Sequence, residues 1–453
     1  MVRALRVGKK ELKLLVSQTS NSGNQLNMTL INLKSHLEYL KGNHKKAITV
    51  LNQCSAIQQP SPTCGPKLDI VYYNNQGVIH FGLGKPTLAC LYLQKALEEL
   101  QAERKSYEEP QPSEPLSNRT LYQVGCIVGP ELCYNLGVTL LHMNKPNRAF
   151  EFLLDVLQAY PSNPRLWLRL AECCIFSHKK RLKENISLES MRKEMVSGPI
   201  GTGAYSKINI ASSLNDHDQN LREQQKISDA AFPEPTLEFS RLCLMNTLTL
   251  LPENVNTEPF TNENEASGEV PELYTAGPSS PMRSSEVLNM RASCYACSSY
   301  VALCLNDYPS AFKHAQALLG LHPNITPAHK LLGHLYAGEA LICLSRIPEA
   351  LLHLDPRLIS DISLSITPEA DQQAPIYTHH HHNQGWYPSN IATATQIMRY
   401  NLSVAYSLRG ELDKAQGLLK EVWNENDDNM PAQIVMLGMY IQLQLGKIFF
   451  LKI

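Results

Sequence analysis

The stretch from residue 130 to 175 decides the fold of this chain: PELCYNLGVTLLHMNKPNRAFEFLLDVLQAYPSNPRLWLRLAECCI. Within it, small residues recur at fixed distances from larger apolar ones. If Gly137 is position 8 of a repeat, Ala149 falls at position 20 and Pro161 at position 32. Ala171 lies 34 residues after Gly137 and takes position 8 of the next unit. The stretch therefore holds most of one repeat and the beginning of another.

A 34-residue unit with this spacing is the tetratricopeptide pattern of two antiparallel helices. Gly137 and Ala149 are expected where the two helices of a hairpin cross, because a side chain larger than a methyl group would push the helix axes apart. Pro161 is expected to end the second helix, since a proline ring cannot continue it. Trp167 takes position 4 of the following unit. One hairpin cannot cover its own apolar face, so the pattern predicts an all-α solenoid of stacked hairpins.

The same spacing recurs before and after this stretch. Gly77 and Ala89 take positions 8 and 20 of an earlier unit. Among the later units, Gly333 and Gly438 are each assigned to position 8, and Ala415 is also a structural repeat position. About six or seven helical hairpins are expected in all.

Composition divides the chain into helical segments and connections. The helical segments are N-terminal repeats at 1–197, a helix at 237–252, central repeats at 285–355 and C-terminal repeats at 391–446. The connections are a polar insertion loop at 198–236, a disordered linker at 253–284, a histidine-containing loop at 356–390 and an atypical tail at 447–453. The linker is expected to be disordered because it has too few large apolar residues to offset its ordering entropy.

Charge and hydropathy exclude several classes of protein. The 453 residues include 41 Lys or Arg and 42 Asp or Glu, for a formal net charge of -1. Direct nucleic-acid binding needs a clustered basic surface, for which this balance gives no strong case. No run approaches the roughly 18 apolar residues of a membrane helix, so no membrane contact is predicted. The twelve cysteines show no paired framework and are expected to be reduced thiols of an intracellular protein.

Three local patterns resemble ligand sites, and each has a plainer interpretation. Four consecutive histidines, His379 to His382, lie in a polar loop and cannot all ligate one ion tetrahedrally on a rigid backbone. Cys294 and Cys297 form a lone CxxC with no second pair at ligand spacing. Gly201 and Gly203 lack the preceding strand and the following Lys-Ser/Thr of a phosphate loop. The sequence therefore predicts no metal site and no cofactor.

No catalytic constellation stands out along the chain. The adjacent Cys173 and Cys174 on a helix are interpreted as core thiols. Neither a GxSxG nor an HExxH motif nor a paired-carboxylate arrangement occurs on a plausible scaffold. Ser280, in a Ser-Pro dipeptide of the linker, is a conceivable phosphorylation site, but a proline-rich loop end is the plainer interpretation. We therefore expect no catalytic residues and no enzyme activity.

The most informative polar feature is an asparagine two residues before position 8 in three repeats: Asn75, Asn135 and Asn401. In the tetratricopeptide arrangement the first helices line the concave face, and this position points into its groove. A carboxamide there can both donate to and accept from the backbone of an extended peptide. A locally satisfied helix asparagine is the alternative, since asparagine is a poor residue for a helix interior. Both interpretations stay open on the sequence alone.

Several longer motifs are specific enough to indicate a family. They lie between Glu38 and about Gly446 and include EYLKGNHKKA, NNQGVIHFGLGK, NPRLWLRLAECCI, GPSSPMR before CYACSSYVAL, GHLYAGEALICL and YPSNIATATQIMRYNLSVAYSL. With these motifs the chain resembles the CCR4-NOT transcription complex subunit 10 family, tetratricopeptide subunits of an mRNA deadenylase complex. The family normally has further repeats before the first motif and a further helix in place of GKIFFLKI. The resemblance therefore implies a chain truncated at both ends.

The resemblance implies a non-catalytic scaffold in mRNA turnover and translational repression. It also implies two partners, subunit 11 and the N-terminal region of the large scaffold subunit, and a cytoplasmic and nuclear location. Two alternatives are weighed against it. One is a generic peptide-binding adaptor of the chaperone-cofactor type, which reads a carboxylate with clustered basic residues that are not evident here. The other is a direct RNA binder, which requires a basic groove lined by aromatic residues.

Overall fold

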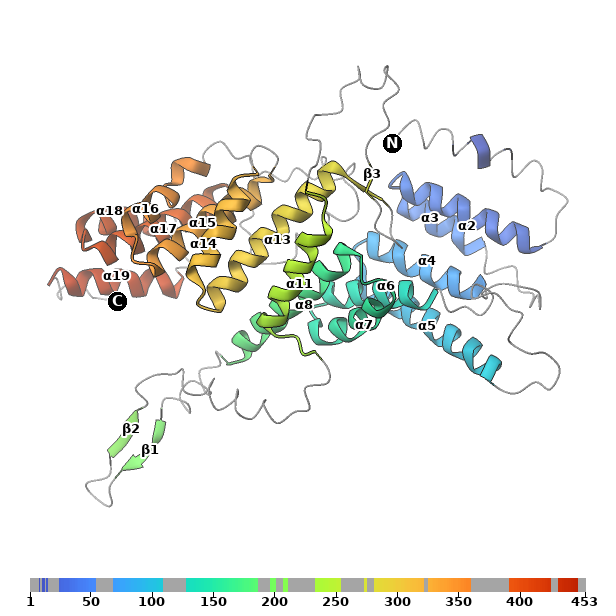
Figure 1. Ribbon diagram of the computed structural model, residues 1–453, viewed down its shortest axis with the longest axis horizontal. Coiled ribbons are helices and arrows are strands. Elements are labelled where there is room, and N and C mark those ends of the chain that lie inside the picture. Colours follow the sequence, from blue (N-terminus) through green and yellow to red (C-terminus); the bar gives the residue numbers. More distant parts are fainter. Residues whose placement is uncertain are drawn as a thin grey trace.

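The computed structural model describes the helices of the chain and parts of their connections (Figure 1). The described residues are 8, 10–12, 14, 24–53, 68–108, 128–185, 196–200, 207–210, 233–253, 273–274, 281–321, 325–359, 391–424 and 431–446. They form an elongated array in which successive helical hairpins stack side by side, with α2 and α19 at opposite ends.

Within the described residues, seven helical hairpins follow one another and a last helix packs on the seventh. The pairs are α2 (Asn24–Leu40) with α3 (His44–Leu51), α4 (Leu68–Gly82) with α5 (Pro86–Glu108), α6 (Val128–His142) with α7 (Pro146–Ala159), α8 (Pro164–Asn185) with α11 (Leu237–Leu250), α13 (Ser284–Cys304) with α14 (Tyr308–Leu319), α15 (Pro327–Cys343) with α16 (Ile347–His353), and α17 (Ile391–Arg409) with α18 (Leu412–Asn424). The last helix is α19 (Ala432–Gln444). The predicted all-α solenoid is confirmed.

The tight turns inside six hairpins share one backbone device. Each turn contains a residue in the left-handed region, with φ of 57 to 87°. These residues are Gly42, Gly84, Asn144, Asn306, Ser345 and Gly410. Glycine and asparagine adopt this conformation most readily, which explains their prevalence here. Five residues after each of them lies a completely buried alanine of the second helix: Ala47, Ala89, Ala149, Ala311, Ala350 and Ala415.

The crossing point of each of these hairpins lies seven residues before the turn residue and takes one of two forms. In the first form it is glycine. A Cβ atom on Gly77 would lie 2.7 Å from Leu93 Cγ, and one on Gly137 would lie 2.7 Å from Leu153 Cγ. Hence no side chain fits without moving a buried leucine of the second helix.

In the second form the crossing residue is a buried serine: Ser35, Ser299 or Ser403. Its hydroxyl donates to the carbonyl oxygen of the buried alanine opposite, at 2.9, 3.2 and 2.9 Å respectively. The bond satisfies the only polar group that the serine brings into the crossing.

The turns correct two sequence assignments of the crossing. Gly338, and not Gly333, occupies the crossing of α15 and α16, because its Cβ would lie 2.7 Å from Cγ of Leu354, which directly follows α16. Gly333 lies five residues earlier and faces the preceding hairpin, where its Cβ would meet Leu319 Cδ2 at 2.8 Å. Gly438 likewise faces the preceding helix α18, with Leu419 Cδ2 at 3.5 Å. Sequence spacing failed here because glycines serve contacts between hairpins as well as within them.

The fourth hairpin is split by the long insertion. The helix expected as an isolated element at 237–252 is α11, and it packs along α8 as the second helix of one hairpin. The hydroxyl of buried Ser240 donates to the carbonyl of Ala171 at 3.2 Å. This crossing therefore also pairs a serine with an alanine, but here the second helix carries the serine and the first helix carries the alanine. The largest core cluster forms around these two helices, with Phe150 of α7 packed edge to face on Phe239. The insertion therefore connects two halves of an otherwise regular unit.

Short strands correct the predicted connections. β1 (Val196–Ile200) and β2 (Lys207–Ile210) pair antiparallel where a polar insertion loop was expected, so Gly201 does follow a strand, contrary to the sequence interpretation. β3 (Leu273–Tyr274) and β4 (Met282–Arg283) pair inside the linker expected to be disordered. That prediction is wrong for Met282, which is buried against Leu251 and Val287 because this end of the linker supplies an apolar anchor. The rest of both predictions lies outside the described residues.

Two further features concern the ends of elements. The 3-10 helix η4 (Pro356–Ile359) begins the segment expected as a histidine-containing loop, and Ile359 is completely buried. The guanidinium of Arg291 in α13 donates to the carbonyls of Pro252 and Glu253, which follow α11. In the part of the chain that the structure describes, no helix is both long and apolar enough to span a membrane.

Candidate peptide-binding groove

The sequence hypothesis concerns three asparagines on first helices: Asn75 on α4, Asn135 on α6 and Asn401 on α17. Each lies two residues before its crossing residue and is half-buried. The structure brings the first two into one hydrogen-bonded row and leaves the third apart.

The row crosses three hairpins. The Asn75 amide donates to Asn32 Oδ1 of α2 at 2.9 Å, and the Asn135 amide donates to Asn74 Oδ1 of α4 at 2.9 Å. A longer contact of 3.5 Å, from the Asn74 amide to Asn75 Oδ1, joins the two bonds. We call Asn32, Asn75, Asn74 and Asn135 the asparagine row.

Sequence analysis missed Asn32 and Asn74. Each lies three residues before its crossing residue, Ser35 or Gly77, so a signal was present. The rule that the structure shows is that a carboxamide two residues before one crossing donates to a carboxamide three residues before the preceding crossing. These bonds join residues 43 and 61 positions apart, so no local pattern within a single repeat could reveal them.

Asn401 behaves differently. Its amide donates to the carbonyl of Ile397 on the same helix at 3.0 Å. This is the locally satisfied arrangement that sequence analysis weighed as the alternative.

A carboxamide offers two amide hydrogens and two acceptor lone pairs. The bond to Asn74 uses one amide hydrogen of Asn135, and its Oδ1 atom makes no side-chain contact within the described part of the chain. The row therefore ties neighbouring first helices together, and Asn135 at its end keeps both acceptor and donor capacity. Such capacity suits the backbone of an extended segment better than any particular side chain.

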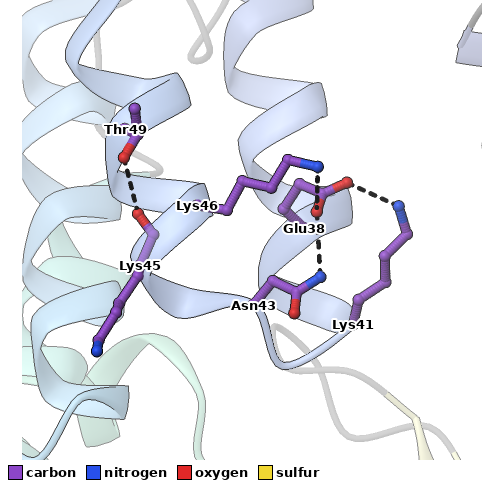
Figure 2. A network of polar contacts seen from close by, with 6 residues as sticks. All are labelled: Glu38, Lys41, Asn43, Lys45, Lys46 and Thr49. Carbon is purple, nitrogen blue, oxygen red and sulfur yellow. Dashed lines mark hydrogen bonds and ion pairs between the residues drawn. The ribbon is translucent and has the colours of Figure 1, made fainter.

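A charged network closes the turn between α2, which carries Asn32 of the row, and α3 (Figure 2). Glu38 Oε1 of α2 accepts a hydrogen bond from Lys41 Nζ at 2.7 Å, and its Oε2 accepts one from Asn43 Nδ2 at 3.2 Å and lies 3.5 Å from Lys46 Nζ. The hydrogen bond from Lys41 does most to lower the pKa of the Glu38 carboxyl. This network fixes α3 against α2, so the first member of the row has a defined position.

The cysteines singled out in the sequence are core residues. Cys173, Cys174 and Cys294 are completely buried, and Cys297 is half-buried on the same helix as Cys294. Burial raises the pKa of Cys174 and of Cys297 to about 12, which leaves both as unreactive thiols at neutral pH. Within the described residues, no group of three or more His, Cys, Asp or Glu side chains could hold a metal ion. His379 to His382, Gly201, Gly203 and Ser280 lie outside those residues.

The remaining repeat positions lie at the junction between hairpins three and four. Pro161 follows the end of α7, and the indole nitrogen of Trp167 donates to its carbonyl at 2.7 Å. Ala171 is completely buried where α8 meets α11. This junction fixes the angle at which α8 leaves the third hairpin.

Hairpins that repeat with one turn geometry and one crossing geometry define a tetratricopeptide-repeat protein, a class built for contacts with other polypeptides. A model of the tetratricopeptide repeat matches residues 130–163, and a model of the CNOT10 tetratricopeptide repeat domain matches residues 289–448.

Individual relatives identify the family. The chain is 36% identical to CCR4-NOT transcription complex subunit 10 of Danio rerio over 98% of its own length and 75% of that protein. It is 35% identical to subunit 10-A of Xenopus laevis over 98% of its length and 62% of that protein. A solved tetratricopeptide repeat protein from Parabacteroides merdae aligns with 92% of this chain and 98% of its own at 8% identity, with a TM-score of 0.38. The chain belongs to the CCR4-NOT transcription complex subunit 10 family.

Proposed function

We propose that this chain is a non-catalytic scaffold subunit of the CCR4-NOT deadenylase complex, acting in mRNA turnover and translational repression in the cytoplasm and nucleus. The observation that carries the proposal is its similarity, over nearly its whole length, to relatives named as subunit 10 of that complex. As the family resemblance implies, the proposed partners are subunit 11 and the N-terminal region of the large scaffold subunit.

The test is reconstitution from purified components. The chain is mixed with subunit 11 and with the N-terminal region of the large subunit, separately and together, and complexes are resolved by size-exclusion chromatography with light scattering. We expect a stable complex with subunit 11, and no shortening of a poly(A) substrate by the chain alone. Separate elution from both partners would overturn the proposal.

We also propose that the asparagine row holds an extended segment by its backbone. The supporting observation is the remaining hydrogen-bonding capacity of Asn135. The variant Asn135→Ala should weaken partner binding about fivefold, the loss of roughly one hydrogen bond. Gln94→Ala, an exposed carboxamide change on the outer helix α5, is the matched control. Equal affinities of the two variants, with unchanged helicity, would assign the row a purely structural role.

A chaperone-type adaptor and an RNA binder are tested in the same preparation. The first would bind an acidic C-terminal tail peptide with a free carboxylate, and the second would bind a single-stranded oligonucleotide with strong salt dependence. We expect neither.

A further inference from the structure

The first helices of hairpins four to six carry ionisable side chains at two positions where α4, α6 and α17 carry asparagine and valine. Two residues before the crossing, α8 has Arg169, α13 has Cys297 and α15 has Tyr336. One residue after the crossing, the same three helices have, in order, Glu172, Tyr300 and Glu339. Residues three apart on one helix share a face, so the two side chains of each helix lie together. Because the helices stack side by side, the six side chains continue the surface of the asparagine row.

Most of the charge on this surface is already neutralised. Arg169 Nη1 pairs with Glu172 Oε2 at 2.5 Å within α8. The ammonium of Lys179 lies 4.5 Å from the ring centroid of Tyr300. The ring of Tyr336 lies 6.3 Å from that of Tyr300, centroid to centroid, at an interplanar angle of 50°. The surface thus holds two adjacent tyrosine rings, one of which already has a cation on it.

Glu339 is the exception. The residue is exposed, and among the described residues no cation forms an ion pair with it. Surrounding protein atoms displace part of its hydration, which raises the pKa of the carboxyl, and no basic group counteracts that shift. Glu339 lies three residues after Tyr336 on α15 and therefore shares a face with it, and the Tyr336 ring adjoins that of Tyr300. Burial does most to raise the pKa of both tyrosines, and the negative charge of Glu339 adds to the shift in each.

We propose that Glu339, Tyr336 and Tyr300 form a subsite for a lysine or arginine side chain carried by a polypeptide segment of a partner protein. We call these three residues the central subsite. A guanidinium or ammonium group there gains a charge-assisted hydrogen bond to the carboxylate and a cation–π contact with the Tyr336 ring, while Lys179 already lies over the adjacent Tyr300 ring. The position of Lys179 over Tyr300 shows that the surface accommodates a cation in this way.

Charge complementarity identifies the occupant. Glu339 has no counter-ion of its own, and a cationic side chain supplies one. A nucleic acid would instead bring phosphates toward this carboxylate, which repels them. The inference rests on neither the asparagine row nor membership of a complex, because it uses other residues and a different interaction.

The first experiment uses the full chain and a fluorescein-labelled, capped Gly–Ser peptide with arginines at regular intervals. Its control peptide carries citrulline in place of arginine, which preserves shape and removes the charge. Binding is followed by fluorescence anisotropy at low and at physiological ionic strength. We expect the arginine peptide to bind more tightly, and Glu339→Gln to weaken it about fivefold.

The control variant is Glu349→Gln, which removes one exposed carboxylate from α16, where it pairs with Arg346. It should leave the affinity for the arginine peptide unchanged. Equal weakening by the two variants would reduce the effect to the net charge of the chain and overturn the proposal. Equal binding of the arginine and citrulline peptides would also overturn it. So would a third outcome, in which the arginine peptide does not bind but a single-stranded oligouridylate does, and Glu339→Gln strengthens the binding of the oligouridylate.

A second measurement needs no variant. Cys343 lies one helical turn after Glu339 and is exposed. Its modification by a maleimide, quantified by mass spectrometry, should slow in the presence of the arginine peptide and not in the presence of the citrulline peptide. Identical rates with both peptides would place the bound arginine elsewhere.

Discussion

The third and seventh hairpins solve one packing problem in two ways. In α6/α7 the crossing residue is Gly137, and the helices meet so closely that a Cβ atom would lie 2.7 Å from Leu153 Cγ. In α17/α18 the crossing residue is Ser403, whose hydroxyl donates to the carbonyl of Ala415 at 2.9 Å. One crossing is held by the contact of apolar atoms, and the other includes a buried hydrogen bond.

The two crossings differ in their residues but share the geometry of the hairpin. Both crossings lie seven residues before a turn residue with positive φ and twelve residues before a buried alanine, Ala149 or Ala415. The repeat therefore fixes a geometry of turn and crossing, within which either glycine or a hydrogen-bonded serine fits. Each kind of crossing should therefore be destabilised by the residue that the other kind uses.

The largest effect is expected at the glycine crossing. Gly137→Ser adds a side chain where Leu153 already lies, and should lower the free energy of unfolding by about 3 kcal/mol through overpacking. Urea denaturation followed by far-UV circular dichroism measures the change. Gly417→Ala is the control, because a Cβ atom there meets nothing within 4 Å. That variant should gain about 0.5 to 1 kcal/mol. Similar stabilities of the two variants would show that Leu153 yields easily.

The reciprocal change at the serine crossing should have a smaller effect. Ser403→Gly loses a buried hydrogen bond and places glycine inside a helix, for a combined loss of about 2 kcal/mol. Ser403→Ala removes only the hydrogen bond and should lose about 1 kcal/mol. The same urea titration distinguishes them. A Ser403→Gly variant as stable as the original chain would mean that the two crossings are interchangeable.

The hairpin α15/α16 extends the comparison to pH. Its glycine crossing at Gly338 is accompanied by a contact of 3.3 Å between His334 Nδ1 and His353 Nδ1. Burial, reinforced by the charges of His353 and Lys330, lowers the pKa of His334 to about 4. Because the unfolded chain binds this proton more readily, stability should fall as the pH drops from about 6.5 toward 4.

Allowing for partial exposure, we expect a loss of about 1 kcal/mol between pH 7 and pH 5 from this group. Thermal melts at both pH values measure it. The variant His334→Gln should show a smaller loss, whereas His36→Gln, at an exposed histidine of α2, should show the full loss. Equal pH dependence in the two variants would contradict the assignment.

The smallest effects are expected on the polar face. Asn135→Ala breaks a bond between hairpins and should cost about 1 kcal/mol, while Asn401→Ala breaks a bond within one helix and should cost about 0.5 kcal/mol or less. Hydrogen exchange should show faster opening of α4 and α6 in the first variant only. Faster exchange of both helices in Asn401→Ala would show that the two ends of the array are coupled.

The sequence predicted the class of fold because packing imposes a strict period. Small residues at Gly77, Gly137 and Ala149 recur at distances that only stacked helical hairpins explain, so a single chain sufficed. The split hairpin was not predicted, because α8 and α11 meet only after an insertion that interrupts the period. Gly333 was misassigned for a related reason: the spacing of small residues does not tell which neighbour each one faces.

The candidate site was only partly predictable. Position relative to the crossing identified Asn75 and Asn135, but their partners, Asn32 and Asn74, lie on preceding hairpins and depend on the stacking of helices. Glu339 carried no sequence signal, since its lack of a counter-ion depends on which side chains surround it. Contacts between repeats thus remain beyond the reach of a pattern that describes one repeat.

The split hairpin also makes the chain divisible. Its two halves are joined across α8 and α11 by Ser240, Ala171 and the largest apolar cluster, whatever the path of the chain between them. Two separately produced polypeptides, one ending after α8 and one starting before α11, should therefore find each other and restore the array. We expect the covalent link at this place to be dispensable for assembly, and a reporter domain inserted there should leave the solenoid on either side unchanged.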